Sequence, residues 1–211
     1  MKSNTIAVIG GTGKSGKYLV NALIENKFKL RLLVRDTRNL GGIHPSIEAV
    51  EGDARDYHCV LSLLAGCEAI ISTLGQPKGE SSIFSQATKN VVKAMKVSGV
   101  NRYVVTTGLS VNTPGDQKDE KVQFATNWMY ENFPETTEDK QVEYEFLSQS
   151  EVAWTLVRLP LIIQTEERFP LKVSSENCAG EKVSATDLAH FLMEQLSDDR
   201  YIGRSPFIFN T

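Results

Sequence analysis

Three glycines spaced three residues apart give the first chemical signal in this sequence. Gly10, Gly13 and Gly16 stand in the segment GGTGKSG, directly after the apolar run TIAVI and before a helical pattern. Glycine lets a chain turn sharply off a strand, lets the backbone approach a ligand, and lets the following helix pack closely. The N–H groups at the start of such a helix attract phosphates. The spacing therefore predicts a phosphate-binding turn between a strand and a helix.

The same segment contains GKS, which invites comparison with the nucleoside-triphosphate loop GxxxxGKS/T. That motif has a glycine five residues before the glycine of GK, whereas this sequence has Val8 there, so the spacing excludes it. An ordinary turn without a ligand is the remaining alternative. The position between an apolar strand and a helix favours phosphate binding over that alternative.

A basic residue ends the second predicted strand. The segment LRLLV is followed by Arg35 and Asp36, with Arg38 close by. In a dinucleotide site that uses NAD, an acid at this point binds the ribose 2′-hydroxyl. A guanidinium instead pairs with a 2′-phosphate through two hydrogen bonds. Arg35 therefore predicts NADP in preference to NAD, and the alternative is that Asp36 binds the ribose.

The ends of the next two strands carry further candidate contacts. Asp53, with Ala54 beside it, stands in EGDARD, where a carboxylate can accept a hydrogen bond from an adenine amino group. The fourth strand ends in STLG, so Thr73, Leu74 and Gly75 are predicted to run past the middle of the dinucleotide. The missing side chain of Gly75 suits a close backbone approach.

Short apolar runs alternate with helical patterns, and these elements must position the candidate residues. Strands are predicted at 5–9, 30–34, 47–50, 68–75, 102–108 and 153–159. Helices are predicted at 14–26, through 60–64, at 82–99 and at 184–196, the last announced by the capping box Ser184-x-x-Asp187. Strands that are apolar throughout and alternate with helices form parallel sheets covered on both faces. The sequence therefore predicts an α/β protein: a single-domain Rossmann fold with a doubly wound, mostly parallel sheet and helices on both faces.

Composition and charge narrow the class of protein. The 211 residues suit one domain, and a formal net charge of −3 gives no electrostatic reason to bind nucleic acid or an anionic membrane. The three cysteines and three histidines are scattered without metal-ligand spacing, so we expect reduced thiols and no metal site. The N-terminus lacks the apolar core of a signal peptide, and no stretch is long enough to span a membrane. We therefore expect a cytoplasmic protein, monomeric or weakly dimeric.

Segments spread over nearly the whole chain share one family pattern. They are IAVIGGTGKSGKYLV, LLVRD, VEGDARD, IISTLG, GVNRYVVTTGLSV, EYEFLSQSEVAWTLVRLPLI and VSATDLAHFLMEQL. In this order they resemble the atypical short-chain dehydrogenase/reductase superfamily, in its small NAD(P)-binding, NmrA-like and biliverdin reductase B-like branch. The resemblance implies a Rossmann fold that binds NADP, with residues of about 108–180 contributing a small substrate pocket.

The resemblance also assigns roles to individual residues. Its dinucleotide contacts fall on Gly10, Thr12, Gly13, Lys14, Ser15, Gly16, Arg35, Asp53, Ala54, Thr73 and Gly75. The nicotinamide end would be lined by Leu159, Pro160, Leu161 and Ile162. Thr106 and Thr107 would approach the nicotinamide ribose. Lys140 corresponds to a basic residue that many relatives turn toward the site, although a lysine on an amphipathic helix usually faces solvent.

The acid–base groups of the family are only partly present. Many dehydrogenases of this superfamily use a Tyr-x-x-x-Lys pair, and none of the six tyrosines here has a lysine four positions on. Biliverdin and flavin reductase relatives use a serine and a histidine, whose positions hold Gly108 and Leu161 here, with Ser110 two residues beyond Gly108. Reduction of a conjugated acceptor needs mainly hydride positioning, because solvent can supply the proton.

Two classes of function therefore stay open. The first is an NADPH-dependent reductase of a flavin, quinone or tetrapyrrole-like acceptor. In that scheme Thr107 positions the ribose, Ser110 or Lys140 polarises the acceptor, and the segment 111–135 caps the pocket. The second is a non-catalytic NADP(H)-binding sensor or regulator, as in NmrA-like proteins. A sugar-nucleotide epimerase is less favoured, because it needs the absent tyrosine–lysine pair and a longer substrate domain.

Overall fold

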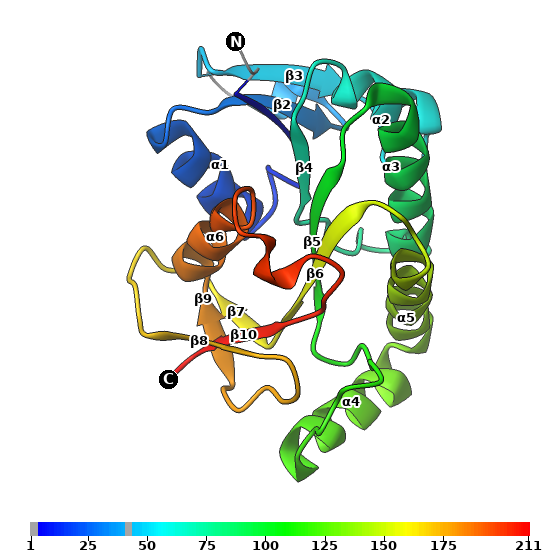
Figure 1. The fold of residues 1–211 in the computed structure, drawn as a ribbon, viewed down its shortest axis with the longest axis vertical. Coiled ribbons are helices and arrows are strands. Elements are labelled where there is room, and N and C mark those ends of the chain that lie inside the picture. The colour runs from blue at the N-terminus through cyan, green and yellow to red at the C-terminus, as the bar shows by residue number, and fades with distance from the viewer. Residues whose placement is uncertain (1–3, 41–43) are drawn as a thin grey trace.

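Strands and helices alternate along most of the chain (Figure 1). The computed structural model describes residues 4–40 and 44–211. The strands are β1 (Thr5–Ile9), β2 (Lys29–Val34), β3 (Ile47–Glu51), β4 (Ala69–Ser72), β5 (Arg102–Gly108), β6 (Ala153–Leu159), β7 (Leu161–Ile163), β8 (Leu171–Ser174), β9 (Lys182–Ser184) and β10 (Phe207–Asn210). The α-helices are α1 (Gly16–Glu25), α2 (Tyr57–Leu64), α3 (Phe84–Ser98), α4 (Glu120–Asn132), α5 (Pro134–Ser148) and α6 (Ala185–Glu194), and short 3₁₀ helices span Thr37–Leu40 and Asp199–Tyr201.

Eight strands of the described residues form one sheet, in the order β3-β2-β1-β4-β5-β6-β10-β8. Neighbouring strands from β3 to β10 are parallel, and β8 runs antiparallel to β10. The short strands β7 and β9 pair separately. The strand order reverses between β1 and β4, and in doubly wound sheets ligands bind outside the carboxyl ends of the strands at such a point. The predicted single-domain Rossmann fold is thus confirmed.

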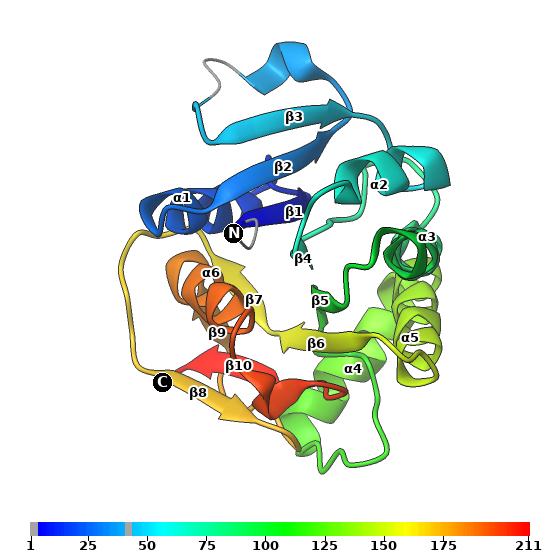
Figure 2. The ribbon, with the colours of Figure 1, turned by 45° about the horizontal axis from the view of Figure 1, so that its top comes forward.

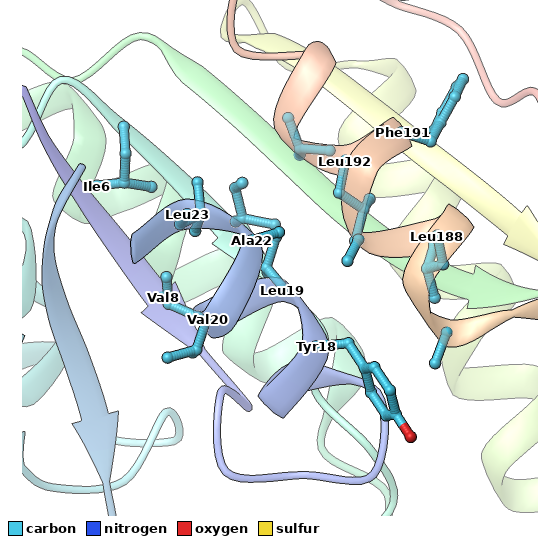
Figure 3. Close-up of a cluster of buried hydrophobic side chains, with 14 of the residues drawn as sticks. Ile6, Val8, Tyr18, Leu19, Val20, Ala22, Leu23, Leu188, Phe191 and Leu192 are labelled. Atoms are coloured by element: carbon cyan, nitrogen blue, oxygen red, sulfur yellow. The ribbon is translucent and has the colours of Figure 1, made fainter. Parts of the chain in front are cut away.

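Helices cover both faces of the sheet, which is why its inner strands are apolar throughout. Helices α1 and α6 pack on one face, and α2, α3 and α5 pack on the other (Figure 2). On the first face, Leu19 and Leu23 of α1 lie in one cluster with Leu188 and Leu192 of α6 (Figure 3). All four side chains are almost fully buried, and each contributes about 1.5–3 kcal/mol to folding. This packing fixes α1 against the sheet and so holds the glycine turn at the end of β1.

Helix α4 and the strands β7 to β10 lie where the sequence predicts no element. Helix α4 begins after Asp119, whose carboxylate accepts a hydrogen bond from the Val122 N–H at 2.9 Å. Within this helix only Val122 and Thr126 are buried, so it lacks the apolar stripe on which helix prediction depends. The polar segment 111–121 is accordingly a loop only as far as Asp119.

The predicted capping box at the start of α6 is half formed. The Ser184 hydroxyl accepts hydrogen bonds from the N–H groups of Thr186 and Asp187, as predicted. The Ser184 N–H donates to Asn210 Oδ1 at 2.6 Å and not to the Asp187 carboxylate. That carboxylate instead accepts from the Phe169 N–H at 2.9 Å and from Asn210 Nδ2 at 3.0 Å. The expectation of a reciprocal box is therefore wrong, because Asp187 ties β10 and the segment before β8 to α6.

Candidate functional site

A cavity of about 530 Å³ lies at the carboxyl ends of β1 to β4. Its walls come from the glycine turn and from the segments that follow β2, β3 and β4. Of the predicted dinucleotide contacts, the walls include Gly10, Thr12, Gly13, Lys14, Ser15, Arg35, Asp53, Ala54, Thr73, Leu74 and Gly75. The rest of the wall comes from Ile9, Leu33, Val34, Gly52, residues 76–78 and Ile83, of which 76–78 lie outside every predicted element. The parallel sheet thus gathers at one edge the residues that the sequence places far apart.

The turn needs glycines because its backbone is tightly packed, as well as because a ligand must approach it. Gly10 has a φ of 78°, and a Cβ there would lie 2.6 Å from the Thr73 carbonyl oxygen. A Cβ on Gly16 would lie 2.0 Å from the Gly10 carbonyl oxygen. Gly16 therefore lets α1 start directly against β1, and it does not itself line the cavity. Gly13 lies in the wall, and its N–H donates to the Gly10 carbonyl at 2.9 Å.

The turn presents backbone donors to the cavity. The N–H groups of Lys14 and Ser15 donate to no acceptor within residues 4–40 and 44–211. Both residues line the cavity, and α1 begins immediately after Ser15 without a side-chain cap. The positive end of the helix dipole lies here too. Unpaired N–H groups, a helix N-terminus and a roomy cavity together fit the diphosphate of a dinucleotide.

Four charged side chains form a network at the rim of the cavity. The Asp53 carboxylate accepts from Arg55 Nε at 2.9 Å and from Arg55 Nη2 at 2.6 Å. The Glu80 carboxylate binds Arg55 Nη1 at 2.7 Å and Arg35 Nη1 at 3.0 Å. Hydrogen bonding by Arg55 holds the pKa of Asp53 below its ordinary value. Arg55 and Glu80 were missed from the sequence, although Arg55 directly follows the predicted pair Asp53 and Ala54.

A second group of predicted residues meets at the end of β5. A Cβ on Gly108 would lie 3.5 Å from Ser110 Oγ and 3.7 Å from Lys140 Nζ, so both groups flank this glycine. The hydroxyls of Thr107 and Ser110 are buried, with no hydrogen-bond partner in the described residues. Lys140 Nζ lies 4.7 Å from the centre of the Phe84 ring. Its amino group is therefore packed into the protein and not on a solvated helix face.

Burial and neighbouring charges shift the pKa values of Lys140 and of Glu143, which lies on the same helix. Burial lowers the pKa of Lys140, against the charges of Glu143 and Asp139. Glu143 is 2% exposed, and burial raises its pKa to about 7. Its carboxylate accepts from Thr88 Oγ1 at 2.6 Å, and Thr88 Oγ1 lies 3.0 Å from the Tyr103 hydroxyl. No sequence pattern pointed to Glu143, because a charged residue on a helix is usually exposed.

The residues predicted for the nicotinamide end lie outside the cavity walls. Thr106 donates to the Ser72 carbonyl at 3.4 Å at the end of β5. Leu159 and Pro160 are buried, whereas Leu161 is 67% exposed on β7. The cavity therefore accounts for the adenosine and diphosphate parts of the predicted site and ends before these residues.

A buried ion pair holds the segment that follows β5. Arg158 of β6 is fully buried, and its Nη1 binds both oxygens of Asp116 at 2.7 and 2.8 Å. Lys118 donates to the Val111 carbonyl at 3.1 Å and to Asn112 Oδ1 at 2.8 Å. Burial lowers the pKa of Lys118 to about 8. These contacts fasten the loop to β6, and none of the residues 111–135 lines the cavity.

The described part of the chain shows neither a metal cluster nor a membrane span. Residues 4–40 and 44–211 contain no group of three or more His, Cys, Asp or Glu side chains that could hold a metal ion. No helix among them has the length and apolar character needed to cross a membrane. A second cavity, of about 750 Å³, lies at the opposite edge of the sheet between Phe28, Glu68, Arg102 and Leu196. The glycine in its wall, Gly99, ends α3, and no described helix begins there.

Comparison with known proteins identifies the family of the chain. Residues 10–199 match the family model described as NAD(P)H-binding. The chain is 29% identical over 137 residues to the chloroplastic protein TIC 62 of Pisum sativum, which covers 53% of this chain and 26% of that protein. It is 30% identical over 139 residues to a 3-beta-hydroxysteroid dehydrogenase of Mycolicibacterium neoaurum, covering 58% of this chain and 38% of that protein. The chain thus spans well under half of the length of these relatives.

Solved structures share the fold over nearly the whole chain. The Escherichia coli O157:H7 protein ChuY, an anaerobilin reductase, matches with a TM-score of 0.82 and 16% identity, over 98% of this chain and 97% of that one. A short-chain dehydrogenase/reductase of Veillonella parvula, solved with NADP, matches with a TM-score of 0.79 and 15% identity, over 98% and 94%. Identities this low establish the fold alone. From the family match over residues 10–199, the chain belongs to the NAD(P)H-binding family of Rossmann-fold proteins.

Proposed function

We propose that the chain is an NADPH-dependent reductase of a planar conjugated acceptor, of the flavin, quinone or tetrapyrrole class. One observation carries the proposal: Ser110 and Lys140 converge on Gly108, at the carboxyl end of the strand next to the dinucleotide cavity. Lys140 Nζ packs over Phe84, whose neighbour Ile83 lines that cavity. A proton-bearing group therefore stands beside the predicted position of the nicotinamide.

The choice of NADP rests on Arg35 and on the pairing of Asp36. Arg35 stands in the cavity wall at the end of β2, within reach of a ribose 2′-phosphate. Asp36, the alternative ribose ligand, binds Arg38 Nε and Nη2 through its two oxygens at 2.9 and 3.0 Å. Its carboxylate is thus engaged away from the ribose. The Veillonella parvula relative solved with NADP supports the same cofactor.

The protein groups have separate tasks in this proposal. The N–H groups of Lys14 and Ser15 hold the diphosphate. NADPH, when bound, supplies the hydride. The buried hydroxyl of Ser110 has no hydrogen-bond partner in the described residues, so it can bind an oxygen or nitrogen of the substrate. The Lys140 ammonium flanks the same glycine, Gly108, and holds a proton next to that hydroxyl. Thr107 supplies a second unpaired hydroxyl for the ribose. The reduced acceptor would carry one hydride from the dinucleotide and one proton held at Ser110 or Lys140.

Binding and turnover measurements test this proposal. NADPH binding is measured by calorimetry, and oxidation is followed by the loss of NADPH absorbance with FMN, menadione or biliverdin as acceptor. We expect turnover with at least one acceptor, reduced about 10²-fold or more by Lys140→Met or Ser110→Ala while NADPH affinity is retained. Lys96→Met, at an exposed position of α3, is the matched control. Tight NADPH binding without turnover on any acceptor would contradict the reductase.

A second function is favoured by the position of the cavity. Its walls contain the residues predicted to bind the adenosine and diphosphate parts of the dinucleotide. They do not contain Thr107, Ser110 or Lys140. A protein that binds NADP(H) as a sensor or regulator needs only the first set. That function predicts equal affinity for NADPH in the wild type and in Lys140→Met, with no turnover by either.

A further inference from the structure

Glu80 brings two arginines to one anion at the rim of the cavity. Each oxygen of its carboxylate takes one guanidinium, Oε1 that of Arg35 at 3.0 Å and Oε2 that of Arg55 at 2.7 Å. The Arg35 side chain is 64% exposed and the Arg55 side chain 37% exposed, so both remain accessible. Two guanidinium groups that share a single carboxylate also have the spacing to share a single phosphate, because both anions accept in-plane hydrogen bonds.

Arg55 is held in place from its other edge. Its Nε and Nη2 bind the Asp53 carboxylate, which also accepts from the Arg55 N–H at 2.8 Å. This leaves Nη1 as the group that points to Glu80. Because Asp53 lines the cavity, Arg55 is anchored directly beside the dinucleotide site. Asp53 therefore acts as a positioning residue for a second arginine.

The carboxylate of Glu80 is carried by a turn that its neighbours define. Gln76 Nε2 donates to the carbonyl oxygens of Glu80 at 2.7 Å and of Pro77 at 3.2 Å. Gly79 has a φ of 76° with open space around it, so it provides the turn before Glu80. The backbone is thus fixed, while the Glu80 side chain is exposed enough to leave its arginine partners for solvent.

From these contacts we infer that Arg35 and Arg55 form a two-arginine clamp for the 2′-phosphate of NADP, and that Glu80 competes with that phosphate for it. The inference rests on the proposed NADPH site and adds to it the residue pair that selects NADP over NAD. A phosphate monoester carries a charge of about −1.5 to −2 at neutral pH, against −1 for a carboxylate. It is therefore the stronger partner for two guanidinium groups, and Glu80 is released when it binds.

The test compares dinucleotides that differ only in the 2′-phosphate. Dissociation constants for NADPH and NADH are measured by calorimetry for the wild type, Arg55→Met and Glu80→Gln. Because a charge-assisted hydrogen bond is lost, Arg55→Met should weaken NADPH binding by about tenfold or more. The affinity for NADH should stay within about twofold of the wild type. Glu80→Gln should tighten NADPH binding several-fold without changing the affinity for NADH. A gain of affinity cannot come from misfolding.

Arg200→Met is the matched control, because Arg200 pairs with Asp198 through the same two-residue spacing away from the cavity. It should leave both affinities unchanged. Equal weakening of NADPH and NADH by Arg55→Met would overturn the clamp and leave Arg55 as a support for Asp53 alone. An unchanged NADPH affinity in both Arg55→Met and Glu80→Gln would also overturn it. If the wild type binds neither dinucleotide, the proposed function itself fails.

Discussion

Replacing Glu143 by glutamine should remove a large pH dependence of folding stability. Glu143 is buried on α5, and its carboxylate accepts a hydrogen bond from Thr88 Oγ1. The charges that act on it are the Lys140 ammonium, which lowers its pKa, and the Asp139 carboxylate, which raises it. Burial outweighs both and raises its pKa to about 7.

The sign and size of this pH dependence follow from the pKa of Glu143 in the native and in the unfolded chain. The native carboxyl, with a pKa of about 7, binds its proton more tightly than the unfolded one, with a pKa of 4.5. The free energy of unfolding is therefore highest below about pH 4.5 and falls as the pH rises through about 7. One pKa unit is worth about 1.4 kcal/mol, so the full loss between the pKa values of 4.5 and about 7 is at most about 3.5 kcal/mol.

Urea unfolding at about pH 5 and about pH 8, followed by circular dichroism, measures this loss. The wild type and Glu138→Gln, an exposed position on α5, should both lose up to about 3 kcal/mol between the two pH values. Glu143→Gln should lose far less, because the amide does not titrate. Comparing the two pH values cancels any constant effect of the amide. The same loss in Glu143→Gln as in the wild type would refute the reasoning.

Two stability predictions follow from the backbone and the buried ion pair. Gly10→Ala should lower the free energy of unfolding by more than about 2 kcal/mol, because the new Cβ would meet the Thr73 carbonyl at 2.6 Å. Gly203→Ala, with a similar φ of 68° but open space, should lower it by only about 1 kcal/mol; equal effects would contradict the packing of the turn. Arg158→Met should lower it by about 3 kcal/mol in urea unfolding, because the buried Asp116 carboxylate loses its short ion pair with the guanidinium and keeps only Lys118, at 3.8 Å, as a cationic partner. Adding Asp116→Leu should restore part of that loss, and a further loss would show that the ion pair is not the cause.

The fold could be predicted because its signals are local. The inner strands are buried on both sides, so they read as apolar runs, and the stop of α3 at Gly99 is marked by a residue with a φ of 75°. The additional strands β7 to β10 are only three or four residues long, and their pairing joins residues far apart in the sequence. Apolar runs as short as LII in β7 and FIF in β10 do not by themselves distinguish a strand from other buried segments.

The site could be predicted only where a residue type at a given place in the fold has one usual role, such as a glycine in a phosphate-binding turn. The glycine turn and the strand ends identified the cavity walls, because each follows a recognisable strand. Arg55, Glu80 and Glu143 escaped, since charged side chains are common and most are solvated. Their importance comes from partners fixed by the tertiary structure, such as the shared carboxylate between Arg35 and Arg55. A single sequence does not reveal such pairings.

Amide hydrogen exchange with and without NADPH tests the dinucleotide site most directly. We expect slower exchange in the segments 10–16, 52–55 and 73–78 that surround the cavity of about 530 Å³. The opposite edge, around Phe28 and residues 193–197, should exchange unchanged, although its cavity of about 750 Å³ is larger. NADPH-dependent protection at that opposite edge, or bound NADPH without any protection of the glycine turn, would contradict the site described above.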